Sequence, residues 1–403
     1  MGDLVKHFMV VRGPAGHASR GGAPARRPCD RGTILSCFPS PADMDAGLRE
    51  NLSLFCLPDH AIPDGLSRCW SFALSEGDGG RLFGVCLAFP VDGTDVDGIE
   101  GAEAKDGVGG EGVVVGGGGP AREARSAGAA GQRPATYVSL CILSRWSFLE
   151  AFKTYLEELF VLRYWESARD TLAASPSFAS GASGSSGGAQ FGFSPRVLPR
   201  VEDFLCNLLH EVPVPPRGRK MVQLTVGLQE MCLKRPAENE IPVLVDPEAL
   251  AGLFRLLDVP SVVRLLRCLV FEEKVVVHCR QPELLTPTIE AIVALLFPFK
   301  WHGVFIPYLP GGLTDLSDLV DMPTMCIVGV HTSYVEAMLR EDGAACIEQV
   351  VLVDLNPQPM QCRDSVSGKT TSMPQVRMGK ECSSKRIAWP KKTKEDLEKQ
   401  ISK

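Results

Sequence analysis

The stretch LLTPTIEAIVALLFPFKWHGVFIPYLP, residues 284–310, decides the fold. Its first half is a dense apolar run that predicts a helix over 288–297, and Pro298 ends that helix because proline cannot donate a backbone hydrogen bond. GVFIP, residues 303–307, follows as a short strand of bulky apolar residues. A helix that leads directly into a buried strand indicates a layered α/β domain.

Strands and helices alternate on both sides of this stretch. KVVVHC (274–279) precedes it as a strand, while MCIVGV (325–330) and QVVLVDL (349–355) follow, with a helix predicted between them over 333–340. Continuous apolar runs are typical of parallel strands that are buried on both faces. Right-handed crossovers would place helices on both sides of the sheet. We therefore predict a three-layer α/β module with a largely parallel sheet, introduced by helices over 201–210, 247–257 and 261–271 and by two short strands within 221–235.

The first part of the chain has the pattern of a second α/β module, so the sequence predicts two lobes. Trp70, Phe72 and Leu74 alternate with smaller residues, which predicts a strand with one buried face. A long helix is expected from Phe148 to about Trp165, because its apolar residues recur at helical spacing and suit core packing. The strands predicted here are His7–Val11, Arg68–Glu76, Arg81–Phe89 and Thr136–Leu143, the second and third forming a hairpin.

Length and composition set the organisation of the chain. At roughly 100–200 residues per domain, 403 residues predict two or three domains. The Gly-rich segment over about 91–133 and the Ser/Gly-rich segment over about 173–192 bury too little apolar surface to fold alone, so we expect an insertion and a linker. A G-x-S-x-G string at Gly184–Gly188 lacks the flanking strand and helix of a hydrolase elbow. The predicted units are 1–172, a linker over 173–198, 199–356, and a basic tail over 357–403.

Composition also argues against several classes of protein. The net charge of −6 does not favour nucleic-acid binding, although the tail from Lys380 to Lys403 is basic. None of the fourteen cysteines forms a C-x-x-C pair, and several lie in apolar runs, so reduced buried thiols are expected rather than a disulfide framework or zinc site. No apolar run reaches the ~18 residues of a membrane helix, and no signal peptide is evident. We expect a cytoplasmic protein without metal or other cofactor, with at most peripheral membrane contact.

Polar residues at the ends of the predicted parallel strands are the candidates for chemistry. Ligands in open α/β sheets bind beyond the carboxyl ends of the strands, where His278, Cys279, His331 and Asp354 fall. An enzyme would use Cys279 as nucleophile and a histidine as base; the simpler interpretation is that these side chains bond to exposed backbone groups. Asp315, Asp318 and Asp321 suit one solvated face of a short helix better than a metal site. The chain has no GxxxxGK[ST] loop, so it is not a P-loop GTPase.

Several strings, in order, resemble the DENN-domain family. LVKHFMVV, ILSCFPSPADMDAGLRENLSLFCLPDH, CWSFALSEGDGGRLFGVCLAF and YVSLCILSRWSFLEAFKTYLEELF resemble its upstream module (uDENN). VEDFLCNLLHEVPVPPRGR, LFRLLDVPSVVRLLRCLVFEEKVVVHC and the opening stretch resemble its core module (cDENN). The tail string WPKKTKEDLEKQISK resembles the opening of the third module (dDENN), which we expect to be truncated. The family-signature positions, all expected to be structural and with Phe299 and Trp301 in the core, are Pro298, Phe299, Trp301, Pro307, Gly329, His331 and Tyr334.

The resemblance implies a fold and a function. It implies a longin-like first lobe, an α/β second lobe, and guanine-nucleotide exchange on a Rab-family small GTPase held across the cleft between them, in membrane traffic and without covalent chemistry. It does not identify the residues of the GTPase interface. Two alternatives remain open: a DENN-fold scaffold that binds trafficking partners without exchange activity, and an α/β enzyme that uses His278, Cys279 and His331.

Overall fold

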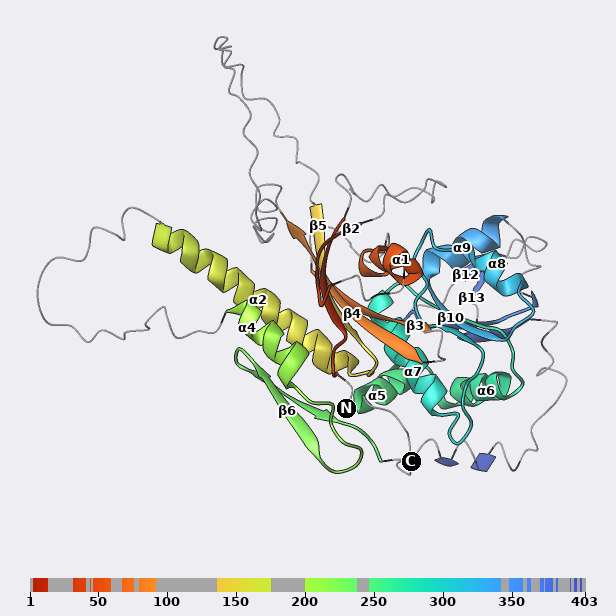
Figure 1. Ribbon diagram of the computed structural model, residues 1–403. Coiled ribbons are helices and arrows are strands. Elements are labelled where there is room, and N and C mark those ends of the chain that lie inside the picture. Colours follow the sequence, from red (N-terminus) through yellow and green to blue (C-terminus); the bar gives the residue numbers. More distant parts are fainter. Residues whose placement is uncertain are drawn as a thin grey trace, which may run out of the picture.

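The computed structural model contains two five-stranded sheets packed side by side with their helices (Figure 1). Among the described residues no helix is both long and apolar enough to span a bilayer. The predicted insertion over 91–133 and linker over 173–198 lie outside the described residues, apart from residues 91, 173 and 174. The structure describes residues 3–13, 32–40, 44, 46–58, 67–75, 80–91, 136–174, 200–237, 246–341, 348–357, 361–363, 370–372, 374–379, 382 and a few single positions between 392 and 400.

The first sheet is antiparallel, with strand order β2-β1-β5-β4-β3. The predicted strands and the hairpin are confirmed. Helix α1 covers one face, where Trp70 Nε1 donates to the backbone oxygen of Phe55 at 2.9 Å. Helix α2 covers the other, where the Phe89 and Phe160 rings lie 4.6 Å apart. The elements are β1 (His7–Arg12), β2 (Thr33–Phe38), α1 (Ala46–Cys56), β3 (Arg68–Ser75), β4 (Arg81–Val91), β5 (Thr136–Ser144) and α2 (Leu149–Ala174).

Strand β2 and helix α1 were not among the predicted elements, and two further details of this sheet differ from the prediction. Strand β3 is buried on both faces, since Ser71 and Ala73 are as buried as Trp70 and Phe72. The reason is that neighbours cover both sides of β3: α1 on one, where Phe55 contacts Trp70 and Phe72, and α2 and α7 on the other. Helix α2 also runs to Ala174, about two and a half turns beyond the predicted end near Trp165.

The second sheet has strand order β14-β11-β8-β10-β9, and all its pairings are parallel except that of β14 with β11. Helices α5, α6 and α7 pack on one face, where Val275 and Val277 belong to the large core that continues into the first sheet. Helices α8 and α9 cover the other face against Val276, Val328 and Leu352. These layers confirm the predicted α/β character. The elements are α5 (Pro247–Leu256), α6 (Val259–Val270), β8 (Val275–Cys279), η5 (Pro282–Leu284), α7 (Leu285–Ala294), β9 (Val304–Ile306), α8 (Leu316–Asp321), β10 (Cys326–His331), α9 (Thr332–Glu341), β11 (Val351–Asp354) and β14 (Val376–Met378).

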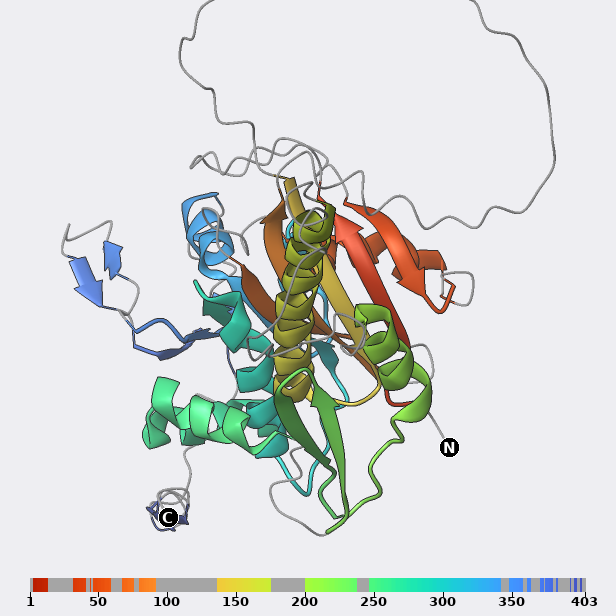
Figure 2. The same ribbon diagram turned by 90° about the vertical axis from the view of Figure 1, so that its left-hand side faces the viewer.

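Residues 201–234 pack differently from the predicted second module. Helix α4 (Val201–Cys206) continues into a π-helical turn (Asn207–Glu211), and β6 (Met221–Val226) pairs with β7 (Gln229–Lys234) in a hairpin. Figure 2 shows both beside α2, and the Tyr155 hydroxyl donates to the backbone oxygen of Phe204 at 2.7 Å. The packing therefore crosses the boundary predicted near residue 199.

The segment for which the sequence predicts a basic tail also contributes strands. Val376–Met378 form the edge strand β14, antiparallel to β11. Gln361–Arg363 (β12) and Thr370–Ser372 (β13) pair in a small separate ribbon. The second sheet therefore extends beyond the predicted module end at residue 356.

Candidate functional site

The edge of the first sheet is joined to the α/β layers by a compact set of contacts that we call the seam, defined as Ser71, Arg81, Thr286, Glu290 and Phe305. The Thr286 hydroxyl of α7 donates to the backbone oxygen of Ser71 in β3 at 2.5 Å. The Arg81 guanidinium pairs with Glu290 at 3.3 Å and lies 3.8 Å above the centre of the Phe305 ring. These contacts hold β3 and β4 against α7 and β9, so they fix how the two sheets meet.

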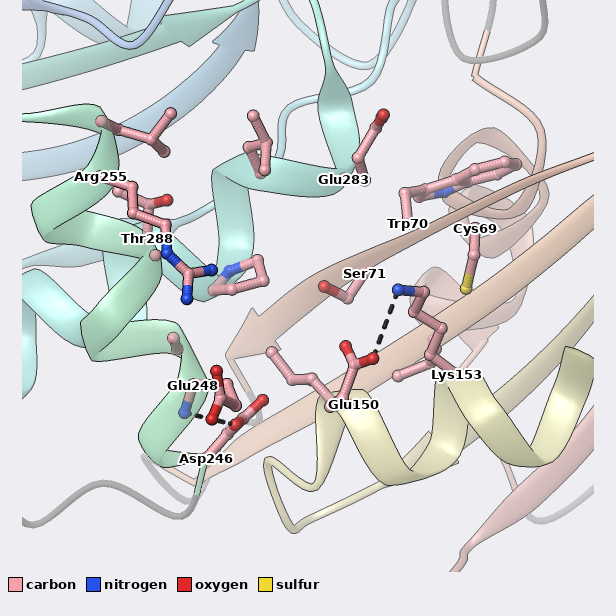
Figure 3. A pocket seen from close by; sticks show the side chains of 17 residues that line it. Cys69, Trp70, Ser71, Glu150, Lys153, Asp246, Glu248, Arg255, Glu283 and Thr288 are labelled. Carbon is pink, nitrogen blue, oxygen red and sulfur yellow. Dashed lines mark hydrogen bonds and ion pairs between the residues drawn. The ribbon is translucent and has the colours of Figure 1, made fainter. Parts of the chain in front are cut away.

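A cavity of about 290 Å³ lies beside the seam. Strand β3, the first turns of α2, helix α5 and the start of α7 surround it, so its walls come from both halves of the chain (Figure 3). Asp246 forms the wall at the start of α5, where its side chain caps the helix by accepting from the Glu248 amide at 3.0 Å. The apolar part of the lining consists of Trp70, Val85, Leu149, Ala249, Leu256, Leu284 and Pro287.

The charged part of the lining is mainly acidic, with four carboxylates (Glu150, Asp246, Glu248, Glu283) against two cations (Lys153, Arg255). Lys153 Nζ pairs with Glu150 Oε1 at 3.4 Å, which uses one carboxylate internally. One oxygen of Glu283 is buried without a hydrogen-bond partner. The cavity therefore presents excess negative charge beside apolar surface, a combination that favours a partner with a basic side chain.

Burial and neighbouring charges shift the pKa of several residues that line the cavity. Burial lowers the pKa of Lys153, but Glu150 and Glu157 outweigh it, so its pKa is raised and the ammonium group stays charged. Burial raises the pKa of the Cys69 thiol and that of the Asp246 carboxyl. No histidine is among the described residues that line the cavity. These residues therefore include no thiolate and no imidazole base to activate a nucleophile.

The predicted strand-end residues form a buried structural network instead of an open site. His278 is 1% exposed, and its Nδ1 lies 3.4 Å from the Thr332 hydroxyl and 3.8 Å from Asp354. Asp354 accepts from the amide and side chain of Asn356 at 2.9 and 2.7 Å. Burial lowers the pKa of His278 more than Asp354 raises it, so the imidazole is neutral at neutral pH. Asp354 therefore bonds to a backbone amide, as the simpler interpretation predicts, whereas His278 contacts the side chains of Thr332 and Asp354.

Cys279 does not have the environment of a nucleophile. It is fully buried and lies opposite His331 on the neighbouring strand. Burial raises the pKa of Cys279 to about 11, so the thiol is protonated at neutral pH. His331 Nδ1 is instead 2.8 Å from the Ser333 hydroxyl and accepts from the Ser333 amide at 3.3 Å. The helix bearing Asp315, Asp318 and Asp321 is present, and all three side chains are solvent-exposed.

The signature positions lie away from the cavity, and one expectation about them is wrong. Phe299 is 70% exposed, because the chain turns outward between α7 and β9, where the Phe299 amide bonds to the Leu296 carbonyl at 2.8 Å. Trp301 is half-buried and donates to the Val304 carbonyl at 3.3 Å.

Gly329 is confirmed as a point of close backbone approach, since a Cβ there would collide with the Pro307 carbonyl. Pro298 is exposed at the start of the same turn, and Tyr334 packs beside the α8–α9 layer.

Sequence reasoning missed the cavity residues. Glu150, Lys153 and Glu248 look like ordinary solvated helix residues, and Glu283 follows a strand without any motif. The one local signal is Asp246-Pro247, a typical helix start with an N-cap and proline in the first turn. This signal marks the beginning of α5, but it does not indicate that α2 and β3 lie across the cavity from α5.

Fold and site together define a mixed α/β protein with an antiparallel sheet joined to a mostly parallel one and an acidic cavity beside the joint. Residues 135–358 match the family described as DENN (AEX-3) domain, and residues 32–89 match the uDENN domain. The chain belongs to the DENN-domain family.

Two curated relatives are similar over part of their length. The DENN domain and WD repeat-containing protein SCD1 of Arabidopsis thaliana is 25% identical over 332 residues, which are 80% of this chain and 22% of that protein. The DENN domain-containing protein C297.05 of Schizosaccharomyces pombe is 34% identical over 129 residues, 32% of this chain and 13% of that protein. The chain thus spans at most about a fifth of the length of these relatives.

Proposed function

We propose that this protein is a guanine-nucleotide exchange factor that promotes GDP release from a Rab-family small GTPase in membrane traffic. The match to the DENN domain over residues 135–358 is the observation that carries the proposal. In this proposal the antiparallel sheet with α1 and α2 corresponds to a longin-like lobe and the α/β layers to a second lobe. The protein would act in the cytoplasm and reach vesicle or organelle membranes peripherally, without covalent chemistry of its own.

Exchange requires only differential binding. A GTPase holds its nucleotide through Mg²⁺ and its switch loops. A protein that binds the nucleotide-free GTPase more tightly than the GDP-bound form must weaken GDP binding by the same factor, because the two equilibria are linked. The required feature is therefore a surface complementary to a remodelled GTPase rather than a catalytic group.

We place part of that surface at the cavity beside the seam. Both halves of the chain contribute to its walls, so a partner bound there would contact both proposed lobes. Its excess of carboxylates, with Glu248 exposed at the start of α5, would attract a lysine or arginine of the GTPase. Charged groups at the edge of an interface mainly change the association rate and its salt dependence.

The direct experiment is release of fluorescent mant-GDP from a panel of purified Rab GTPases, with and without this chain. Acceleration on one or two members supports exchange activity. A Rab that binds equally well with and without GDP, and loses nucleotide no faster, would instead support the scaffold.

A charge variant tests the placement on the responding Rab. Glu248→Gln should slow exchange several-fold at low ionic strength, with a smaller effect at high salt because screening weakens the attraction. Glu230→Gln removes an exposed carboxylate on the β6–β7 hairpin and serves as the matched control. Equal rates for both variants would exclude the cavity as the GTPase contact while leaving exchange itself intact.

A further inference from the structure

Three cysteines meet in the core of the first sheet. Cys56 ends α1, Cys86 lies in β4 and Cys141 lies in β5, and none of the three side chains is exposed. Their Sγ atoms all lie within 4.8 Å of one another. Cys86 and Cys141 are direct partners across the strands, and Cys56 approaches the pair from the helix above. The group is therefore a preformed sulfur cluster built from three separate elements.

A fourth sulfur atom belongs to the same face of the sheet. Met9 is fully buried and lies directly opposite Cys141 across β1 and β5. Residues directly opposite in a sheet present their side chains on the same face. Among the residues that the structure describes, this cluster contains only thiols, without carboxylate or imidazole. Thiolate and thioether donors select soft ions such as copper(I).

The number and kind of donor atoms discriminate between ions. The cluster offers three sulfur atoms within 4.8 Å of one another, all from fully buried side chains. A structural zinc ion takes four strong ligands in a tetrahedral arrangement, so three thiols leave it one ligand short. Sulfur-only donors select copper(I) instead.

We propose that Cys56, Cys86 and Cys141 form a binding site for one soft monovalent metal ion, copper(I), with Met9 as an additional weak sulfur donor. The ion would enter while the chain folds, since the finished site is closed to solvent, and its binding energy would then stabilise the folded state. It would tie the end of α1 to β4 and β5. The site lies in the core of the first sheet and is independent of GTPase binding.

The test refolds the full chain from denaturant under anaerobic conditions with copper(I) present, and then challenges the folded protein with the competing chelator bicinchoninate. Cys206→Ser and Cys232→Ser are introduced throughout, because these two cysteines are exposed and would bind the ion adventitiously. We expect one copper(I) ion per chain that resists the chelator and is lost in Cys141→Ala. Cys326→Ala, which removes a buried cysteine of β10 outside the cluster, should keep that ion.

A spectroscopic measurement on the intact cluster does not depend on whether the Cys141→Ala variant folds. X-ray absorption of the copper-loaded chain with the cluster intact should give sulfur-only coordination with three short bonds, and the thermal midpoint should rise on loading. Nitrogen or oxygen ligands, tighter retention of zinc than of copper(I), or equal copper retention by Cys141→Ala and Cys326→Ala would each overturn the proposal.

Discussion

At the residue scale, Gly329 of the second sheet leaves no room for a side chain. A Cβ at this position would collide with the Pro307 carbonyl and lie 2.9 Å from Ile289 Cδ1. Backbone cannot move aside as a flexible side chain can, so Gly329→Ala should lower the free energy of unfolding by about 1–3 kcal/mol, the usual cost of overpacking a core. Urea unfolding followed by circular dichroism measures the change.

Gly252 offers the matched control for that substitution. It lies within α5, and nothing lies within 4 Å of a Cβ built there. Gly252→Ala should therefore stabilise the protein by about 0.5–1 kcal/mol, since alanine restricts the unfolded chain and favours helix. Destabilisation by both alanines to the same extent would contradict the assigned role of Gly329.

Glu290 should make the stability of the seam depend on pH. Burial raises its pKa to about 7, although Arg81 opposes the shift. The folded protein then holds this proton more tightly than the unfolded chain does, so the stabilisation is complete below the ordinary carboxyl pKa and is lost as pH rises through 7. Relative to wild type, Glu290→Gln should gain about 2 kcal/mol in unfolding free energy between pH 5 and pH 8.

Chemical denaturation at several pH values checks the Glu290 prediction. Glu336→Gln is the control, since Glu336 pairs with the exposed Arg280 and Arg340. Parallel stability profiles for wild type and Glu290→Gln would show that Glu290 does not titrate differently on folding.

Phe299 illustrates what a residue pattern cannot predict. Its position between the apolar end of α7 and the strand β9 is typical of a core aromatic residue, yet its ring lies mostly in solvent. The direction of a side chain in a turn depends on the backbone path, which a local pattern does not specify. Gly329 was predictable because a glycine between buried strand residues itself indicates close backbone approach.

At the element scale, the β6–β7 hairpin and α2 stabilise each other by packing together. Leu233 of β7 is fully buried, and the hairpin packs against α2. Leu233→Ala should lower the free energy of unfolding by about 2–5 kcal/mol, because contacts are lost and a cavity is left. Hydrogen exchange should accelerate in α2 and in the hairpin, and much less in β8 and β10, if the damage remains local.

The control for Leu233 is Gln223→Ala on the outer face of β6. That side chain is exposed and bonds only to Glu230, so little change in exchange is expected. Faster exchange in β8 and β10 than in α2 after Leu233→Ala would place the hairpin with the second sheet, as the sequence alone suggests.

Most of the elements could be predicted because their signals are local. The strands of the second sheet are apolar runs, and α5 and α6 begin with an aspartate N-cap and a proline. The second buried face of β3 could not, since it depends on neighbours supplied by distant segments. Chain order also placed β6 and β7 with the residues that follow them, whereas they pack on the helix before the linker.

At the scale of the whole molecule, the features with functional interest all come from long-range contacts. Arg81 and Glu290 are 209 residues apart in sequence, and the cavity combines residues from Cys69 to Thr288. Cys56, Cys86 and Cys141 share no motif spacing, so the expectation of reduced, buried thiols did not predict that three of them meet. Local periodicity predicts elements, but it does not predict which surfaces meet.

The seam should keep the two sheets in one cooperative unit. Arg81→Ala removes both the Glu290 pair and the stacking on Phe305. We expect lower stability by about 1–3 kcal/mol, because Glu290 is left partly buried without its partner. Exchange on the responding Rab should slow as well, if the partner contacts both halves. Arg340→Ala removes an exposed pair with Glu336 and is the control. If the Arg81→Ala protein is less stable but still promotes exchange at the wild-type rate, the seam does not contribute to exchange.

Under the proposed function, the protein binds a nucleotide-free GTPase more tightly than the GDP-bound form. The most direct measurement is the dissociation constant of this chain with the responding Rab, determined once with the GTPase stripped of nucleotide and Mg²⁺ and once with it loaded with GDP. Exchange by linkage predicts tighter binding to the stripped form by a factor of at least about 100, the upper part of the usual coupling range. Equal dissociation constants for the two forms would contradict the exchange mechanism and favour a scaffold.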